Sequence, residues 1–231
     1  MIIPGVVAAF RQAIAAACDL YWDQVVLVMH MDADFSDEKG HTPTIYGSSS
    51  ISATNQFGGG SGYFDGSSFG SVNFTSTDFQ ITGDFAIDFW VKLDAALVNT
   101  TCVLVALHYP SSTSALFSIS ATVGVTPDSY VLGCDICSAP ARSYSTFTHV
   151  LLSRSGVTTR LFLDGALAAS TTSSISLPID TTMLSIGSFR STSYSGSYTK
   201  GYIDDLRITN AVARYTTDFT PPTAPFPDVA C

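Results

Sequence analysis

The segment GDFAIDFWVKL, residues 83–93, decides the fold class of this chain. Apolar residues occupy every second position from Phe85 to Val91, and Asp88 and Trp90 lie between them. Successive side chains of a β-strand point to opposite faces of a sheet, so this two-residue period places one set of side chains in a core. The segment is predicted to be a strand with one buried face, and the bulk of Trp90 favours a place in the core as well.

Short runs of the same kind lie on both sides of this strand, separated by loops rich in Ser, Thr and Gly. In TRLFLDGALAAS (159–170), Asp164 and Gly165 predict a two-residue hairpin turn, because a type I′ turn needs positive φ at both positions. Together the runs predict an all-β fold, a two-sheet antiparallel sandwich of the jelly-roll type. The other predicted strands are QVVLVMHM (24–31), CVLVALHY (102–109), SALFSIS (114–120), YVLGCDI (130–136), FTHVLLS (147–153), MLSIG (183–187) and GYIDDLRIT (201–209).

The composition agrees with a β-protein and argues against two classes of partner. Of the 19 acidic residues in the 231-residue chain, 18 are Asp and only Glu38 is Glu, so strong helix formers are scarce. The net charge of −9 repels phosphate backbones and anionic lipids, so we expect neither nucleic-acid binding nor membrane-surface binding. No run of 18 apolar residues predicts a membrane span.

Three segments are predicted along the chain: an N-terminal helical docking segment (1–22), the sandwich (23–220) and a Pro-rich C-terminal strap (221–231). The first segment does not match a signal peptide, because it lacks a basic beginning and Arg11 interrupts its apolar run. A helix from Gly5 to Asp19 would dock on a partner chain or on its own domain, and a cleaved or disordered leader is the other alternative. Its apolar stripe consists of Val6, Val7, Phe10 and Ile14, with Ala17 at its end.

The five cysteines suggest cross-links rather than metal or redox chemistry. Cys134 and Cys137 form a C-x-x-C motif, but a zinc site needs a second pair and a redox motif needs a helix N-terminus. Cys18 and Cys231 lie at the margins of the domain, so we expect at least one of them to form a disulfide, with each other or across subunits. Cys102 and Cys134 lie in predicted strands that could be adjacent, and they either pair or remain buried thiols.

Six segments of the chain carry a family resemblance that spans nearly all of residues 22–227. The segments are VVLVMHMD (25–32), FGGGSGYFDG (57–66), GDFAIDFWVKL (83–93), FTHVLLSRSGVTTRLFLDG (147–165), LSIGSF (184–189) and GYIDDLRITNAVARYTTDFTPPTAPFP (201–227). In these segments the chain resembles the concanavalin A-like lectin/glucanase superfamily in its laminin-G-like branch. The last segment is the most specific, and it looks like the version found in bacteriophage virion proteins of tail fibres, appendages and capsid surfaces.

The resemblance includes glucanases, but the residues do not predict an enzyme. The glucanases of the superfamily use a Glu-x-Asp-x-Glu strand, whereas Glu38 stands alone here. Asp84 and Asp88 would share one face of a strand at roughly 13 Å, far more than the separation of about 5 Å in a retaining glycosidase.

The resemblance also implies two ligand sites. Laminin-G-like relatives often carry Ca²⁺ at the rim of the sandwich, and Asp32, Asp65 and Asp205 lie in matching segments where they could approach one another. Asp32 belongs to the acidic stretch 32–41, for which a solvated loop is the alternative. For a glycan, we expect aromatic contacts from Tyr109, Tyr194 and Tyr198, for which ordinary surface tyrosines are the alternative.

The function predicted from the sequence is therefore that of a non-catalytic structural or adhesive component of a bacteriophage particle, in a capsid decoration or tail appendage. The N-terminal segment would dock on other virion proteins or on copies of this chain. The protein would be assembled in the host cytoplasm and then lie at the virion surface, outside the cell. The alternative is a carbohydrate-binding module that recognises host surface glycans.

Overall fold

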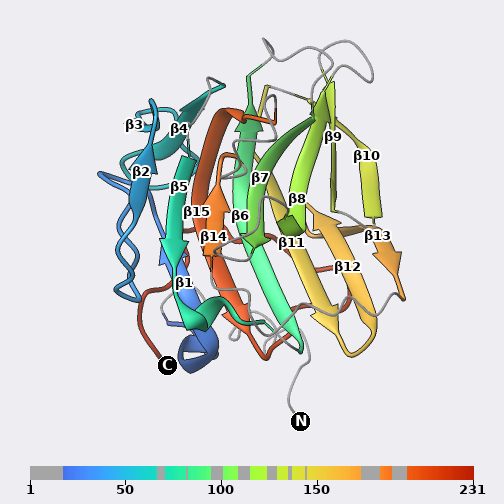
Figure 1. The fold of residues 1–231 in the computed structure, drawn as a ribbon. Coiled ribbons are helices and arrows are strands. Elements are labelled where there is room, and N and C mark those ends of the chain that lie inside the picture. Colours follow the sequence, from blue (N-terminus) through green and yellow to red (C-terminus); the bar gives the residue numbers. More distant parts are fainter. Residues whose placement is uncertain are drawn as a thin grey trace.

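The computed structural model forms two antiparallel sheets packed face to face (Figure 1). It describes residues 18–66, 71–81, 83–94, 101–108, 115–123, 129–134, 137–143, 145–172, 183–188 and 197–231. The predicted all-β sandwich is confirmed. No helix within the described residues is long and apolar enough to cross a membrane.

The larger sheet has the strand order β13-β12-β11-β6-β15-β4-β3, and β1 also pairs with β15. The segment that predicts the fold, residues 83–93, contains β6 near the middle of this sheet, between β11 and β15. The strands are β1 (Val25–Met29), β3 (Ser50–Ser52), β4 (Ser61–Asp65), β6 (Phe85–Leu93), β11 (Thr148–Ser155), β12 (Thr158–Leu163), β13 (Ala166–Thr171) and β15 (Lys200–Asn210).

The smaller sheet has the strand order β10-β9-β8-β7-β14-β5-β2. Two short 3₁₀ helices, η1 (Trp22–Gln24) and η2 (Thr77–Phe79), lie outside the sheets. The strands are β2 (Thr44–Tyr46), β5 (Ser71–Thr75), β7 (Thr101–His108), β8 (Ala115–Val123), β9 (Ser129–Cys134), β10 (Cys137–Ser143) and β14 (Met183–Ile186).

The core lies between the sheets and contains the residues that the alternation of β6 predicts. Phe85, Ile87, Phe89 and Val91 are all buried in it. Phe64 from β4 belongs to the same cluster. Burial of this large apolar surface is the dominant stabilising contribution to such a sandwich.

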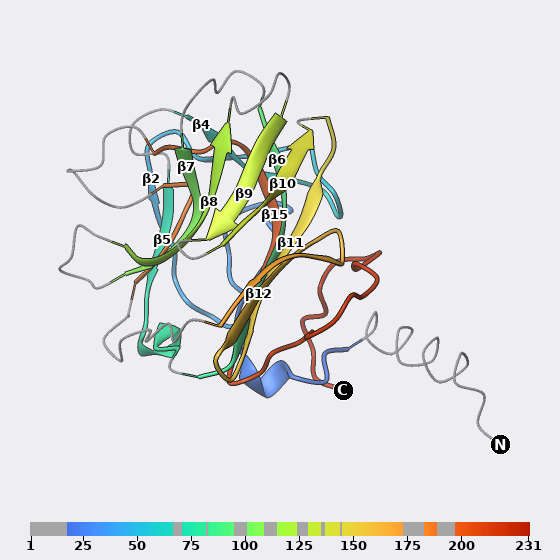
Figure 2. The ribbon, with the colours of Figure 1, turned by 90° about the vertical axis from the view of Figure 1, so that its right-hand side faces the viewer.

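The outer face of β6 is also buried, which the alternation alone does not predict. Asp88 and Trp90 point away from the core, yet they are only 1% and 7% exposed. The C-terminal segment, residues 211–231, runs along the outer side of the larger sheet (Figure 2). Its Phe219 packs on Phe162 and joins a small apolar cluster there.

The expected burial of Trp90 is confirmed, but its side chain lies on the outer face of the larger sheet and not between the two sheets. Its ring contacts Phe57 at 5.5 Å and His149 at 5.0 Å between centroids, on the outer face of the larger sheet. The sequence did not predict which face buries it, because a large aromatic residue can be buried by a loop as well as by the opposing sheet, and the strand pattern does not separate the two cases.

The predicted hairpin is confirmed between β12 and β13. Asp164 and Gly165 have φ values of 51° and 79°, as a type I′ turn requires. The Gly165 carbonyl accepts a hydrogen bond from Phe219 N at 2.9 Å, and a Cβ on Gly165 would overlap the Phe219 carbonyl oxygen. The turn thus also serves as a support for the C-terminal segment.

The predicted N-terminal helix, with its stripe from Val6 to Ile14, lies outside the described residues apart from its end. Cys18 and Asp19 are described and are not helical: Asp19 forms a parallel β-bridge with Ala230. The helix was expected to reach Asp19, so its predicted end is wrong, because pairing with the C-terminal segment fixes an extended backbone there.

Candidate functional site

The two terminal segments of the domain meet at one corner, which we call the terminal corner (Cys18–Tyr21 and Val229–Cys231). Cys18 and Cys231 form a disulfide between residues 213 positions apart. Beside it, Asp19 N donates to Val229 O at 2.8 Å and Cys231 N donates to Asp19 O at 3.3 Å. This is one of the two pairings that the sequence left open, and it joins the segments covalently.

A buried ion cluster anchors the corner to the sheet. The two terminal nitrogens of the Arg214 guanidinium, Nη2 and Nη1, donate to the Asp19 carboxylate at 2.7 and 3.0 Å, and Arg207 donates to it at 3.0 Å. Arg207 also donates two hydrogen bonds to Asp88, at 2.6 and 3.2 Å. Burial alone would raise the pKa of Asp19, but the hydrogen bond and charge of Arg214, with the charge of Arg207, outweigh it and lower that pKa.

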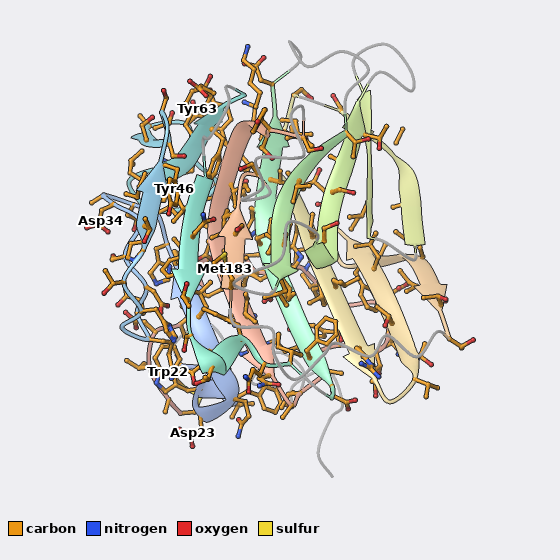
Figure 3. The ribbon with its side chains drawn as sticks, in the orientation of Figure 1. Trp22, Asp23, Asp34, Tyr46, Tyr63 and Met183 are labelled. Atoms are coloured by element: carbon orange, nitrogen blue, oxygen red, sulfur yellow. A yellow bond between two sulfur atoms is a disulfide. The ribbon has the colours of Figure 1, made fainter. Side chains whose placement is uncertain are left out.

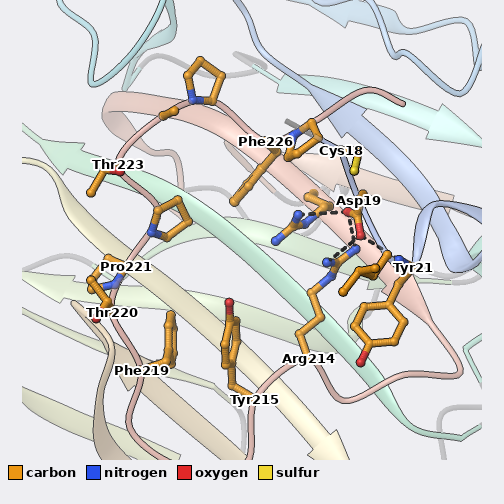
Figure 4. A pocket seen from close by; sticks show the side chains of 16 residues that line it. Cys18, Asp19, Tyr21, Arg214, Tyr215, Phe219, Thr220, Pro221, Thr223 and Phe226 are labelled. Atoms are coloured by element: carbon orange, nitrogen blue, oxygen red, sulfur yellow. Dashed lines mark hydrogen bonds and ion pairs between the residues drawn. The ribbon is translucent and has the colours of Figure 1, made fainter. Parts of the chain in front are cut away.

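A pocket of about 470 Å³ opens between this corner and the C-terminal segment (Figure 4). The rings of Tyr215 and Phe219 stack in its wall at 3.9 Å between centroids. The Arg207 guanidinium lies 3.9 Å from the ring centre of Phe226. The remaining lining comes mainly from Tyr21, the hydroxyls of Thr220 and Thr223, and four prolines of the C-terminal segment.

Exposed apolar side chains surround the pocket. Leu20, Tyr21, Tyr215 and Val229 are among the few large apolar residues that the described part of the chain leaves exposed. The arrangement suits binding better than proton transfer, because the carboxylate in the pocket, that of Asp19, is held between two guanidinium groups.

A comparison of the sequence with protein-family models identifies the family. The family model described as the concanavalin A-like lectin/glucanases superfamily matches residues 43–214. The chain belongs to this superfamily. No curated protein matches the chain.

Solved structures share the lectin-like fold of this superfamily member at low sequence identity. The binding domain of Paraclostridial Mosquitocidal Protein 1 has a TM-score of 0.62 and 11% identity, over 83% of this chain and 50% of that one. Trypanosoma rangeli sialidase gives 0.63 and 13%, over 89% and 36%. A structure of botulinum neurotoxin type C gives 0.57 and 12%, over 82% and 48%. This chain spans half or less of each of them, and the similarity shows the fold alone.

The calcium ligands expected for the lectin-like domain are not brought together. Asp32 accepts hydrogen bonds from Gly59 N and Gly60 N, and Asp205 accepts from Phe226 N and pairs with His30. Asp65 lies opposite Lys200, five positions from Asp205 along β15, which is roughly 16 Å along a strand. Among the described residues, no group of three or more His, Cys, Asp or Glu side chains could hold a metal ion.

The expected glycan contacts lie away from the pocket or outside the described residues. Tyr109 and Tyr194 fall in undescribed segments. Tyr198 is partly exposed beside Ser197, whose carbonyl accepts from Val103 N, and it does not line the pocket.

For Cys102 the structure decides between the two alternatives that the sequence left open, a disulfide with Cys134 and a buried thiol. Cys102 is a free, buried thiol whose pKa burial raises to about 11, so it stays protonated and inert. Strand β8 separates β7 from β9, so Cys102 does not pair with Cys134, and the other alternative, a buried thiol, is confirmed for Cys102. Cys134 and Cys137 are backbone partners where β9 meets β10, and their side chains lie outside the described part.

Sequence reasoning did not find the ion cluster of Asp19, Asp88, Arg207 and Arg214. The only available signal was that Asp88 and Arg207 are charged residues within predicted strands, at positions facing away from the core. Asp19 lies 188 residues from Arg207, and no local pattern connects them.

Proposed function

We propose that this chain is a non-catalytic structural and adhesive component of a bacteriophage particle, attached through the terminal corner. The observation that carries the proposal is the joining of both terminal segments there, by the Cys18–Cys231 disulfide and the Asp19 cluster, beside the exposed side chains of Leu20, Tyr21 and Tyr215. Exposed apolar side chains that surround a pocket are typical of a protein contact surface.

The carboxylates of the described residues support a non-catalytic role. Glu38 is exposed and alone, Asp84 accepts from Gly156 N, and Asp88 is paired with Arg207. Burial raises the pKa of Asp204 to about 6, in the range of an acid catalyst. However, Asp204 is only 1% exposed and accepts from Gln56 N and Phe57 N, so it anchors a loop out of reach of a substrate.

The assignment to a phage particle is supported by the resemblance of residues 201–227 to virion proteins. We propose that the apolar stripe of Val6, Val7, Phe10 and Ile14, which precedes Cys18 in the sequence, docks on other virion proteins or on copies of this chain. At the virion surface, outside the cell, a disulfide at the corner would persist.

The test is incorporation into particles, measured by separating free chain from particles on a density gradient. Leu20→Asp places a charge on the 64% exposed side chain at the corner, and Val157→Asp does the same on a 61% exposed side chain in the β11–β12 turn, which does not line the pocket. We expect Leu20→Asp, or deletion of residues 1–16, to reduce incorporation about tenfold or more while Val157→Asp has no effect. Equal incorporation of all variants, with folding verified by circular dichroism, would refute attachment at the corner.

A second candidate function is recognition of a host surface glycan. Three partly exposed aromatic rings, Tyr63, Tyr202 and Phe147, lie near one another on the larger sheet. Cell entry of the fold relative botulinum neurotoxin type C depends on interaction with two ganglioside molecules. Binding of the purified chain to host cells, and its loss after periodate oxidation of the cell surface, would test this function.

A further inference from the structure

One row of side chains crosses the outer face of the larger sheet. Tyr63 on β4, Tyr202 on β15 and Lys92 on β6 are direct partners in the ladder. Phe147 directly precedes β11, whose Thr148 is the partner of Val91, so it continues the row beside Lys92. We call Tyr63, Tyr202, Lys92 and Phe147 the aromatic row.

The side chains of the aromatic row contact one another and remain partly exposed. The ring centroids of Tyr63 and Tyr202 are 5.0 Å apart, and those of Phe147 and Tyr202 are 6.5 Å apart. The Lys92 ammonium lies 5.8 Å from the ring centre of Tyr202. All four side chains are intermediate in exposure, in contrast to Trp90 in the adjacent row, which is buried.

A charged row lies next to the aromatic row and consists of Asp65, Lys200 and Asp94. Asp65 and Lys200 are ladder partners, and the Lys200 ammonium is 3.7 Å from the Asp94 carboxylate. Burial, with the negative charges of Asp94 and Asp65, raises the pKa of Tyr63, so its phenol stays a hydrogen-bond donor at neutral pH.

The charges of this surface balance, although the whole chain is acidic. Lys92 and Lys200 offset Asp65 and Asp94, while the complete sequence has a net charge of −9. Such a surface gives no electrostatic preference to an anion or a cation, but it offers donors and acceptors on both sides of the rings.

We propose that the aromatic row and the charged row together bind a neutral saccharide chain. The apolar C–H faces of sugar rings pack on aromatic rings. Sugar hydroxyls can accept hydrogen bonds from the lysines of this surface and donate hydrogen bonds to its carboxylates. From β4 to β11 the row crosses three strand spacings, roughly 14 Å, so it fits a chain of sugars better than a single one. This inference rests on the adhesive part of the proposed function.

The position of the surface fits that role. Figure 3 shows Tyr63 at the upper end of the molecule and Trp22, close to the terminal corner, at the lower end. The C-terminal segment contacts the outer face at His149 and Phe162, in other rows than the aromatic row. A domain attached at its corner therefore presents the aromatic row away from the attachment.

The experiment is affinity gel electrophoresis of the full chain in gels that contain dextran, laminarin or galactomannan, with polygalacturonate as an anionic comparator. The variants are Tyr202→Ala and Tyr63→Ala, with Tyr202→Phe to keep the ring and Tyr21→Ala as an exposed tyrosine at the corner. We expect retardation in at least one neutral gel. Loss of either ring in the row should weaken it about tenfold, while Tyr202→Phe and Tyr21→Ala retain it.

Several outcomes would overturn the inference: no retardation in any neutral gel, retardation by polygalacturonate alone, or unchanged retardation of both alanine variants. Thermal unfolding verifies that each variant is folded. If one of the alanine variants does not fold, Lys92→Ala is used in its place. If Tyr202→Ala loses incorporation into particles but keeps its retardation in the gels, the aromatic row is a protein interface. That outcome would also refute the proposal. Leu20→Asp should change incorporation and leave retardation unchanged, so the two proposals fail independently.

Discussion

Single residues at the edge of this sandwich connect segments that are distant in the sequence. His41 lies between two carboxylates: its Nδ1 pairs with Asp37 and its Nε2 pairs with Asp78 at 2.9 Å. Asp37 also accepts a hydrogen bond from Val28 N, so the group links β1 to η2 through one imidazole. Burial alone would lower the pKa of His41, but the hydrogen bonds and charges of Asp78 and Asp37 outweigh it and raise that pKa.

This residue predicts a pH dependence of stability. Because the folded pKa is raised, the stabilisation by His41 is complete below its unfolded pKa of about 6.5 and is lost as pH rises through the folded pKa. We expect urea unfolding to give a lower free energy at pH 9 than at pH 6, and His41→Gln to reduce that difference. The hydrogen bond to Asp205 also raises the pKa of His30, so His30 accounts for part of the pH dependence that remains in His41→Gln. The same pH dependence in His41→Gln and in the unsubstituted chain would contradict this account.

At the scale of elements, the C-terminal segment gives the larger sheet its second buried face. Phe226 N donates to Asp205, Leu167 N donates to Asp218, and Phe219 N donates to Gly165 O. His149 beneath the segment is fully buried, and burial lowers its pKa to about 4, so it stays neutral at physiological pH. The segment therefore covers a sheet face that carries both polar and apolar side chains, with a few aromatic contacts and backbone hydrogen bonds.

Two hairpin glycines test how much the segment depends on the β12–β13 turn. Gly165 and Gly156 both have positive φ, but a Cβ on Gly165 would overlap the Phe219 carbonyl, whereas a Cβ on Gly156 meets nothing within 4 Å. Gly156→Ala should cost about 1 kcal/mol from backbone strain alone. We expect Gly165→Ala to cost at least about 1 kcal/mol more in urea unfolding, because the C-terminal segment must move. Equal costs would show that the segment does not press on the turn.

At the scale of the whole molecule, Tyr63 of the aromatic row and Trp22, close to the terminal corner, lie at opposite ends (Figure 3). The terminal corner closes the chain on itself, because the disulfide joins residues 213 positions apart. The sandwich has its own extensive core between the sheets. The disulfide is therefore expected to stabilise the fold without being required for it, since its main effect is to restrict the unfolded chain.

Reduction of the disulfide tests this expectation. Dithiothreitol should lower the free energy of unfolding by about 2–4 kcal/mol, and the domain should remain folded at 25 °C. The matched control is Cys18→Ser/Cys231→Ser, which should be less stable by a similar amount and should not respond to the reductant. A reductant effect of the same size in that control would place the stabilisation in another cysteine pair.

Local chemistry in the sequence determined most of the fold. The alternation in residues 83–93 predicted a strand and its core face, and Asp164-Gly165 predicted a hairpin, because side-chain period and turn geometry are properties of neighbouring residues. The six segments that carry the family resemblance predicted the superfamily, because they too are local stretches of sequence. The sequence also showed that Glu38 is alone, which argues against the glucanase mechanism.

Only the tertiary structure decided which surfaces of the sandwich are buried and which distant residues meet on them. Strand period assigns Asp88 and Trp90 to the face opposite the core, but it does not show that a loop and the C-terminal segment bury that face. The Asp19 cluster and the aromatic row depend on the register of β4, β6 and β15 and on the path of the terminal segments. Such contacts join residues far apart in the chain, and pairing register is set by packing of the whole core, which no local pattern contains.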